Sequence, residues 1–362
     1  MKKDRVRKIG ISFALWAAGI LLTVLANHVE GFAQWYSTHV YPVWVNVLGR
    51  ITGVFPFSVA EILLYLFLIL LLVSLIVLIW RRAGKRQILG WLSSLFLAAG
   101  VLYLLYVMNC GINYSRTSFS ESSGIKMEEY TVSELKEVCI WLTEQVDTFS
   151  GAVTRDENGV MRLTKGNKGE VQSRAVEAMQ KLGESYPELS GYYPKPKGLL
   201  VPWILSVQQL SGIYSPFTIE ANYNSGMVGY NIPFTASQEL SHLKSFMQEQ
   251  EANFIAFLAC TSYEDPEFQY SGYLLGWIYC MNVLHDADYE AWQEVRDMLL
   301  AETEADLREN SAFWAGYDGT VAEVANQVND QYLQANGQEE GVKSYDRMVD
   351  LIVSYYGMGT TS

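Results

Sequence analysis

The sequence contains few of the residues that build disulfide frameworks, metal centres and nucleotide sites. It has four cysteines and four histidines in 362 residues. No two cysteines form a Cys-x-x-Cys pair, which excludes a zinc ribbon and a thioredoxin-type redox motif. The glycine-rich fingerprints of P-loop and dinucleotide-binding domains are also missing, so no nucleotide is expected as a partner. We expect buried free thiols, with a Cys260–Cys280 bridge as the alternative.

Charged residues are missing from three long apolar runs in the first third of the chain. The runs cover residues 9–28, 62–80 and 88–110. Each is close to the roughly 20 residues that a helix needs to cross a bilayer core of about 30 Å. A segment in lipid must also satisfy its own backbone hydrogen bonds, which favours helix. We therefore expect a membrane domain of residues 1–110 with three transmembrane helices.

Basic residues lie at one end of each run and orient the helices. The sequence MKKDRVRK precedes the first run, and RRAGKR at Arg81–Arg86 joins the second to the third. The positive-inside rule places both in the cytoplasm, so the residues after Cys110 are expected on the outer side. A cleaved signal peptide is the competing interpretation, but no small-x-small cleavage site follows the first run. Four aromatic residues are expected at the outer membrane interface: Trp35, Tyr36, Tyr41 and Trp44.

Acidic residues dominate the remainder of the chain. Residues 1–110 contain ten Lys and Arg against three Asp and Glu, a balance of +7, whereas the whole chain carries −13. Residues 111–362 therefore carry −20. So acidic a domain argues against nucleic acid as a partner. The lipid bilayer remains as a partner, together with a peptide or another membrane protein.

Helical periodicity prevails in the outer domain, expected at residues 131–362 after a Ser-rich linker at 111–130. Apolar spacing predicts an amphipathic helix at 131–150, capped by Thr131 or Ser133, and several more towards the C-terminus. Alternating residues at 218–223 and 227–232 predict a hairpin or an edge strand. Thr235 or Ser237 is the expected cap of the helix that follows. The predicted fold is mainly α with a small sheet.

That helix contains the motif Gln-Glu-Leu-Ser-His at residues 238–242. Positions 238 and 242 are four residues apart, so their side chains project from one face. In the zinc-protease motif His-Glu-x-x-His, two histidines at this spacing bind zinc and the glutamate is the general base. Here His242 is a competent ligand and Glu239 is placed as the base. The first ligand position holds Gln238.

A third ligand has to come from a later segment. Glu251 is the expected one, nine residues after His242, and Glu249 is the alternative. Gln238 is the difficulty, because an amide oxygen is a poor zinc donor and protein zinc sites are built from Cys, His, Asp and Glu. Zinc is therefore a possible but doubtful cofactor. Taken alone the motif carries little weight, since Glu and His occur at this spacing in many helices.

Flanking blocks give the motif its context. They are PFS at Pro56–Ser58, SGIYSPFTIEANYN at Ser211–Asn224, NIPFTASQELSH at Asn231–His242, EANFIAFLAC at Glu251–Cys260, YSGYL at Tyr270–Leu274 and YLQANGQEEGVKSYDRMVDLI at Tyr332–Ile352. Together they resemble a family of bacterial membrane proteins, the domain-of-unknown-function family numbered thirty-eight ten. The resemblance covers nearly the whole chain and implies three membrane spans followed by an α+β, zincin-like extracytoplasmic domain in the plasma membrane of a bacterium.

The resemblance also implies a site. Carried over from the family's intact His-Glu-x-x-His motif, the metal-ligand positions are Gln238, His242 and Glu251, with Glu239 as the catalytic base. The chain departs from the family pattern at Gln238, and again at Ser245, where the family has a glycine. The departure at Gln238 bears directly on zinc binding. The departure at Ser245 is minor on sequence grounds, because serine can end a helix.

Four further residues are candidates for a substrate cleft. Glu220 and Asn222 would line it beside an edge strand, since such strands bind extended peptides, although turn and strand roles are the simpler explanation for both. Tyr270 and Tyr345 would donate a hydrogen bond to a developing oxyanion. Packing is the plainer role for any one of the 23 tyrosines.

Three hypotheses follow for the function. The first is a membrane-anchored pseudoenzyme whose zincin-like domain binds a peptide or an envelope partner. The second is a working zinc metallopeptidase with an atypical ligand set. The third is a structural protein of the cell envelope, in which the motif has no chemical role. A useful discriminator is whether the side chains of Gln238, His242 and Glu251 converge on one point.

Overall fold

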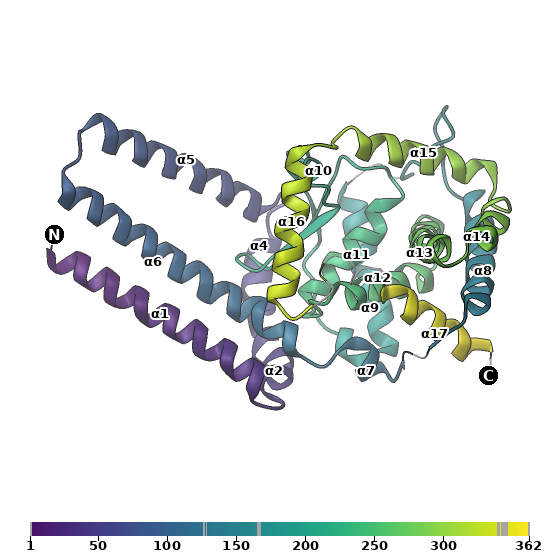
Figure 1. Ribbon diagram of the computed structural model, residues 1–362, viewed down its shortest axis with the longest axis horizontal. Helices are drawn as coiled ribbons and strands as arrows, with labels where there is room; N and C mark the ends of the chain where they lie inside the picture. Colours follow the sequence, from purple (N-terminus) through teal and green to yellow (C-terminus); the bar gives the residue numbers. More distant parts are fainter. Residues whose placement is uncertain are drawn as a thin grey trace. The chain divides into compact units, whose positions relative to one another are not determined.

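The structure is a computed structural model that describes residues 2–125, 127, 129–164, 168–338, 341 and 347–360. It is mainly helical with one small sheet (Figure 1). The chain forms two compact units. The N-terminal unit comprises Met1–Arg116 together with Ser215–Glu220, and the helical unit comprises Thr117–Tyr214 together with Ala221–Ser362.

Three long helices make up most of the N-terminal unit: α1 (Lys2–His28), α5 (Val59–Trp80) and α6 (Lys85–Asn109). All three are long and apolar enough to cross a membrane, which confirms the prediction of three such helices. α1 packs along α6, where the rings of Trp16 and Tyr103 stack at 4.5 Å. Gly19 permits this approach, because a Cβ there would lie 2.5 Å from the Tyr103 ring.

A helical segment joins the end of α1 to the start of α5. It consists of α2 (Phe32–Trp35), a π turn (Tyr36–Val40), α3 (Tyr41–Trp44), a second π turn (Val45–Gly49) and α4 (Arg50–Gly53). Ser58 then caps α5 by accepting a hydrogen bond from the backbone N–H of Glu61. A short 3-10 helix (Gly111–Ser115) follows α6.

The helical unit is built around α11 (Asn231–Leu243), α12 (Glu249–Ser262) and α13 (Pro266–Ala287), which pack against one another. Helix α8 (Val132–Ser150) packs on α13, and α9 (Lys168–Ser185) packs on α11. The remaining helices are α7 (Phe119–Ser123), α10 (Trp203–Ser206), α14 (Tyr289–Arg296), α15 (Ala301–Ala315), α16 (Thr320–Ala335) and α17 (Met348–Thr360). A further 3-10 turn covers Pro187–Leu189.

Helix α8 begins where the sequence predicts. The Thr131 hydroxyl accepts a hydrogen bond from the Glu134 backbone N–H at 3.2 Å, and the Glu134 carboxylate accepts one from the Thr131 N–H at 2.6 Å. This reciprocal pair is a capping box, which satisfies two backbone donors of the first turn. The predicted linker at 111–130 is more ordered than its serine content suggests, because it contains α7 with Phe119 fully buried.

The small predicted sheet is present, with β1 (Lys197–Gly198), β2 (Gly212–Ser215) and β3 (Glu220–Tyr223) in the order β1-β3-β2. β1 runs parallel to β3. The hairpin therefore pairs 212–215 with 220–223, and the predicted strand at 227–232 is wrong: α11 already begins at Asn231. Pro233 fits the first turn of a helix, where its missing N–H is not needed. Thr235 and Ser237 lie inside α11 and do not cap it.

All four cysteines are buried free thiols, and no Cys260–Cys280 bridge is formed.

Candidate functional site

Helices α11 and α12 bring the motif and a later carboxylate together. Every side chain of α11 from Pro233 to Leu243 is buried, so the motif lies in the interior of the helical unit. The chain then reverses within a few residues and α12 begins at Glu249. Ser245 makes the turn with a φ of 74°, in the left-handed region that favours glycine. Ser245 is therefore a position of backbone strain.

Gln238, His242 and Glu249 meet at one point. The Gln238 side-chain amide donates a hydrogen bond to Glu249 Oε2 at 3.2 Å, and His242 Nε2 lies 3.5 Å from the same oxygen. The side chains of His242 and Glu249 are 9% and 12% exposed. The geometry thus brings Glu249, the alternative third residue, to the motif.

His242 is held as a charged donor. Its Nδ1 lies 2.9 Å from the Phe246 carbonyl oxygen, which can only accept a hydrogen bond. Burial lowers the pKa of His242, but the negative charge of Glu249 and their hydrogen bond outweigh burial and raise that pKa to about 9. At neutral pH, His242 and Glu249 are therefore an ion pair in the interior of the protein.

Glu239 points to a different neighbour. A Cβ on Gly212 of β2 would lie 2.4 Å from Glu239 Oε1, so a side chain at this position would require the Glu239 carboxyl group to move. Glu239 Oε2 is buried and has no hydrogen-bond partner among the described residues. Burial and the charge of Glu249 raise the pKa of Glu239 to about 8, against the opposing effect of His242. Glu239 is consequently a neutral acid at pH 7.

Glu251, the expected third ligand, contacts α7. Its carboxylate accepts hydrogen bonds from the backbone N–H of Ser120 at 2.9 Å and from the Ser120 hydroxyl at 2.7 Å. Ser120 lies in the first turn of α7, where a negative charge is favourable because the N–H groups there lack helical partners. Glu251 thus holds α7 against α12, and the α12 residue that contacts Gln238 and His242 is Glu249.

The donor set does not fit a resident zinc ion. Ligand atoms about 2.1 Å from a tetrahedral zinc lie roughly 3.4 Å apart, a spacing close to that of the three side chains here. Only His242 and Glu249 are ordinary zinc ligands, however, and the Gln238 amide turns its nitrogen to the carboxylate. In the described part of the chain, no group of three or more His, Cys, Asp or Glu side chains is placed to hold a metal ion.

Glu220 and Asn222 lie on β3, and their contacts are with backbone. The Glu220 carboxylate accepts hydrogen bonds from the N–H groups of Val59 and Ala60, at 3.0 and 2.7 Å, in the first turn of α5. The Asn222 amide donates to the Ile213 carbonyl at 3.2 Å, across the hairpin. Glu220 thus serves as an acceptor for the N-terminus of α5 within the N-terminal unit.

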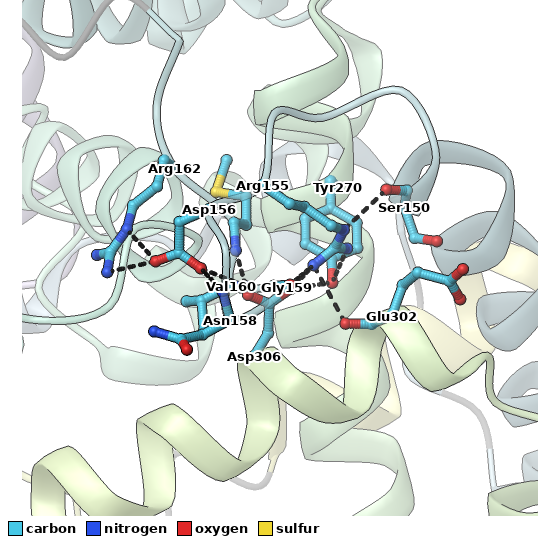
Figure 2. A network of polar contacts seen from close by, with 11 residues as sticks. Ser150, Arg155, Asp156, Asn158, Gly159, Val160, Arg162, Tyr270, Glu302 and Asp306 are labelled. Carbon is cyan, nitrogen blue, oxygen red and sulfur yellow. Dashed lines mark hydrogen bonds and ion pairs between the residues drawn. The ribbon is translucent and has the colours of Figure 1, made fainter.

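Tyr270 belongs to a buried polar network that links α13 and α15 (Figure 2). Its hydroxyl donates to Asp306 Oδ2 at 2.6 Å and accepts a hydrogen bond from Arg155 at 3.1 Å. Arg155 also pairs with Asp306 at 2.7 Å, and the Met161 backbone N–H donates to the other Asp306 oxygen at 2.7 Å. Tyr270 is fully buried. Tyr345 lies outside the described residues.

Sequence reasoning did not find the network of Arg155, Tyr270 and Asp306. Arg155 and Asp306 are 151 positions apart, and each lies in an otherwise ordinary polar stretch. Their only local signal is that Asp306 is an acidic residue on the buried side of α15. The Glu239–Gly212 contact has no signal either, because nothing in the sequence shows which strand residue faces the motif.

One comparison with known proteins gives a match. The model of the family described as Protein of unknown function (DUF3810) matches residues 36–353, which include α5, α6, the hairpin and the Gln-Glu-Leu-Ser-His helix. No curated protein and no solved structure matches the chain. Since the family model covers most of its length, the chain belongs to the DUF3810 family.

Proposed function

We propose that the chain is an integral membrane protein whose helical unit is a degenerate, zincin-like relative of metallopeptidases. In this proposal the unit binds a peptide or an envelope partner and does not cleave it. The observation that carries the proposal is the contact of Gln238 and His242 with the carboxylate of Glu249. The side chains at the positions where a protease binds its metal form polar contacts with a carboxylate of the same protein instead.

Without a metal ion, the protonation states of Glu239 and His242 favour a structural role. A general base has to accept a proton near the working pH, and its pKa is tuned accordingly. Glu239, with a pKa of about 8, is protonated at pH 7, and His242, with a pKa of about 9, is an imidazolium. Without a metal ion, the imidazolium has no ring electron pair to offer a ligand, and the protonated carboxyl group cannot take up a proton from water. The ion pair of His242 and Glu249 is suited to holding α11 and α12 together.

The edge strand supports a binding role. β2 lies at the end of the strand order, and Gly212 on it contacts Glu239. An extended peptide adds to such an edge through backbone hydrogen bonds, which require little of the peptide sequence. Ile213 on β2 is 47% exposed and offers an apolar contact to a bound chain. We propose this edge as the place where an extended segment binds.

The membrane orientation is part of the same proposal. The basic segments at the N-terminus and at Arg81–Arg86 would lie in the cytoplasm of a bacterium, and the acidic helical unit outside its plasma membrane. The −20 charge of residues 111–362 would keep that unit away from anionic headgroups.

A working zinc metallopeptidase is the second candidate, and one observation favours it. His242 donates its Nδ1 hydrogen to a carbonyl, which is the arrangement that fixes metal-binding histidines with Nε2 towards the metal. Under this alternative, Gln238 or a water molecule would complete an atypical ligand set.

Metal content distinguishes the two candidates. The full-length protein is purified in detergent with zinc in the medium, beside Gln238→His, His242→Ala and Glu249→Ala variants, and zinc per chain is measured by atomic emission. We expect less than stoichiometric zinc in the natural protein and about one ion per chain in Gln238→His. Stoichiometric zinc in the natural protein that is lost in His242→Ala would overturn the pseudoenzyme proposal. Peptidase assays on the same samples then show whether bound zinc supports hydrolysis.

A further inference from the structure

The helical segment between α1 and α5, residues 32–53, has an exposed apolar stripe. Trp35, Val43, Val47 and Ile51 are between 50 and 58% exposed. They are spaced by four or eight residues, and His39 fills the gap with its ring stacked on Trp35 at 6.2 Å. The two π turns widen the helix beyond 3.6 residues per turn, so residues four apart lie along one line.

The opposite face of the segment packs inside the N-terminal unit. Five of its buried residues are also spaced by four: Ala33, Ser37, Tyr41, Val45 and Gly49. Ser37 is fixed there by a hydrogen bond from its hydroxyl to Asn113 at 2.8 Å. Packing within the unit therefore accounts for one face of the segment and leaves the apolar stripe outside.

A polar stripe runs beside the apolar one. It contains Gln34, Thr38, Asn46 and Arg50, and the last three are exposed. Arg50 donates a hydrogen bond to the Asn46 side chain at 3.5 Å, and the Thr38 hydroxyl donates to the Gln34 carbonyl at 2.8 Å. Arg50 is the only residue of the segment charged at pH 7. The exposed surface is thus divided lengthwise into apolar and polar halves.

The position of residues 32–53 in the chain indicates which partner covers the apolar stripe. It begins just after α1 ends and finishes just before α5 begins, and Figure 1 shows it crossing the ends of the long helices. If α1 and α5 span a bilayer, the segment lies where hydrocarbon meets the headgroups. A helix with an apolar and a polar side suits that boundary, and tryptophan is enriched there.

We infer that residues 32–53 form an interfacial helix that lies in the plane of the membrane. Trp35, Val43, Val47 and Ile51 enter the acyl boundary, while Thr38, Asn46 and Arg50 face the headgroups. The inference rests on the membrane spans of the proposed function and adds a lipid-binding surface to them. It also revises the four aromatic residues expected at the interface, since Tyr36 and Tyr41 are buried in the N-terminal unit.

Spin-label accessibility tests this inference in the full chain. Single cysteines are introduced at Val43, Val47 and Ile51, and at Asn46 on the polar stripe as the adjacent control. A label at Leu68 in the middle of α5 reports on the span itself. The natural cysteines are buried, and the unmodified protein measures their background labelling. The protein is reconstituted into vesicles of phosphatidylethanolamine and phosphatidylglycerol.

We expect labels at Val43, Val47 and Ile51 to collide more with oxygen than with a water-soluble nickel complex, and the label at Asn46 to show the reverse. Preferential collision with nickel along the stripe, while Leu68 reports lipid, overturns the interfacial helix and leaves the spans intact. Immobilised labels with low collision rates for both reagents overturn it too, because a protein surface then covers the stripe. Nickel access at Leu68 would refute the membrane spans and the proposed function with them.

Discussion

The buried carboxyl group of Glu239 makes the stability of the helical unit dependent on pH. Its pKa is about 8 in the folded protein, compared with an ordinary value of 4.5. A group whose pKa is raised by folding stabilises the protein most below its unfolded pKa, and that stabilisation is lost as the pH rises through the folded pKa. The unfolding free energy should therefore fall between about pH 4.5 and pH 8. His242, raised from 6.5 to about 9, acts in the same direction up to pH 9.

The Glu239→Gln variant isolates the contribution of one group. A pKa difference between 4.5 and about 8 corresponds to about 5 kcal/mol, gained at roughly 1.4 kcal/mol per pH unit. Glutamine keeps the volume of the side chain and carries no charge at any of these pH values. The variant should match the natural protein at pH 5 and be more stable at pH 9. In a domain of this size, the gap in Tm would be on the order of 10 °C.

This Tm difference is measured by thermal unfolding in detergent between pH 5 and pH 9.5, with tryptophan fluorescence as the signal. Glu290→Gln removes an exposed carboxyl group on α14 and serves as the control, whose Tm should follow the natural protein at every pH. A gap between Glu239→Gln and the natural protein that stays constant with pH would refute the reasoning. So would a natural protein that becomes more stable as the pH rises.

Three further predictions concern residues around the site. Ser245→Gly should raise the Tm by a few degrees, because it relieves a left-handed conformation that costs roughly 1–2 kcal/mol. The greater chain entropy of glycine in the unfolded state opposes this gain by about 0.5–1 kcal/mol. A lower Tm would show that the contacts of the serine side chain outweigh the relief of backbone strain. Glu251→Ala should make α7 susceptible to limited proteolysis, because the N–H and hydroxyl of Ser120 lose their acceptor at a cost of about 2–3 kcal/mol. An unchanged digestion pattern would show that Glu251 does not hold α7 in place. Asp306→Asn should cost about 3–5 kcal/mol in denaturant unfolding, because it leaves the Arg155 guanidinium, whose side chain is only 14% exposed, without its counter-charge. A loss below about 1 kcal/mol would show that solvent stabilises the guanidinium charge instead.

The apolar runs and the mainly helical character could be predicted from the sequence because they depend on local composition. Runs of about 20 uncharged residues allow few alternatives to a helix, and α1, α5 and α6 cover the predicted ranges. The start of α11 was missed for an equally local reason. Pro233 is typical of the end of a strand and of the first turn of a helix, and only packing decides between them.

The site itself was predictable only in part. Helical spacing correctly puts Gln238 and His242 on one face, because four residues make about one turn. The choice between Glu249 and Glu251 depends on the phase of α12, which is set by the tight turn at Ser245. Two residues along a helix rotate a side chain by more than half a turn. Glu251 therefore reaches Ser120, while Glu249 reaches the motif.

The contact of Glu220 with α5 has a consequence for biosynthesis. The N-terminal unit is not a continuous stretch of the chain, since residues 215–220 supply the acceptor for the first N–H groups of α5. Chains emerge from the ribosome N-terminus first, and domains usually fold in that order. Here α5 is made roughly 160 residues before its acceptor. The N-terminus of α5 therefore gains its acceptor only after residues 117–214 of the helical unit have been synthesised, so the N-terminal unit is completed after part of the helical unit already exists.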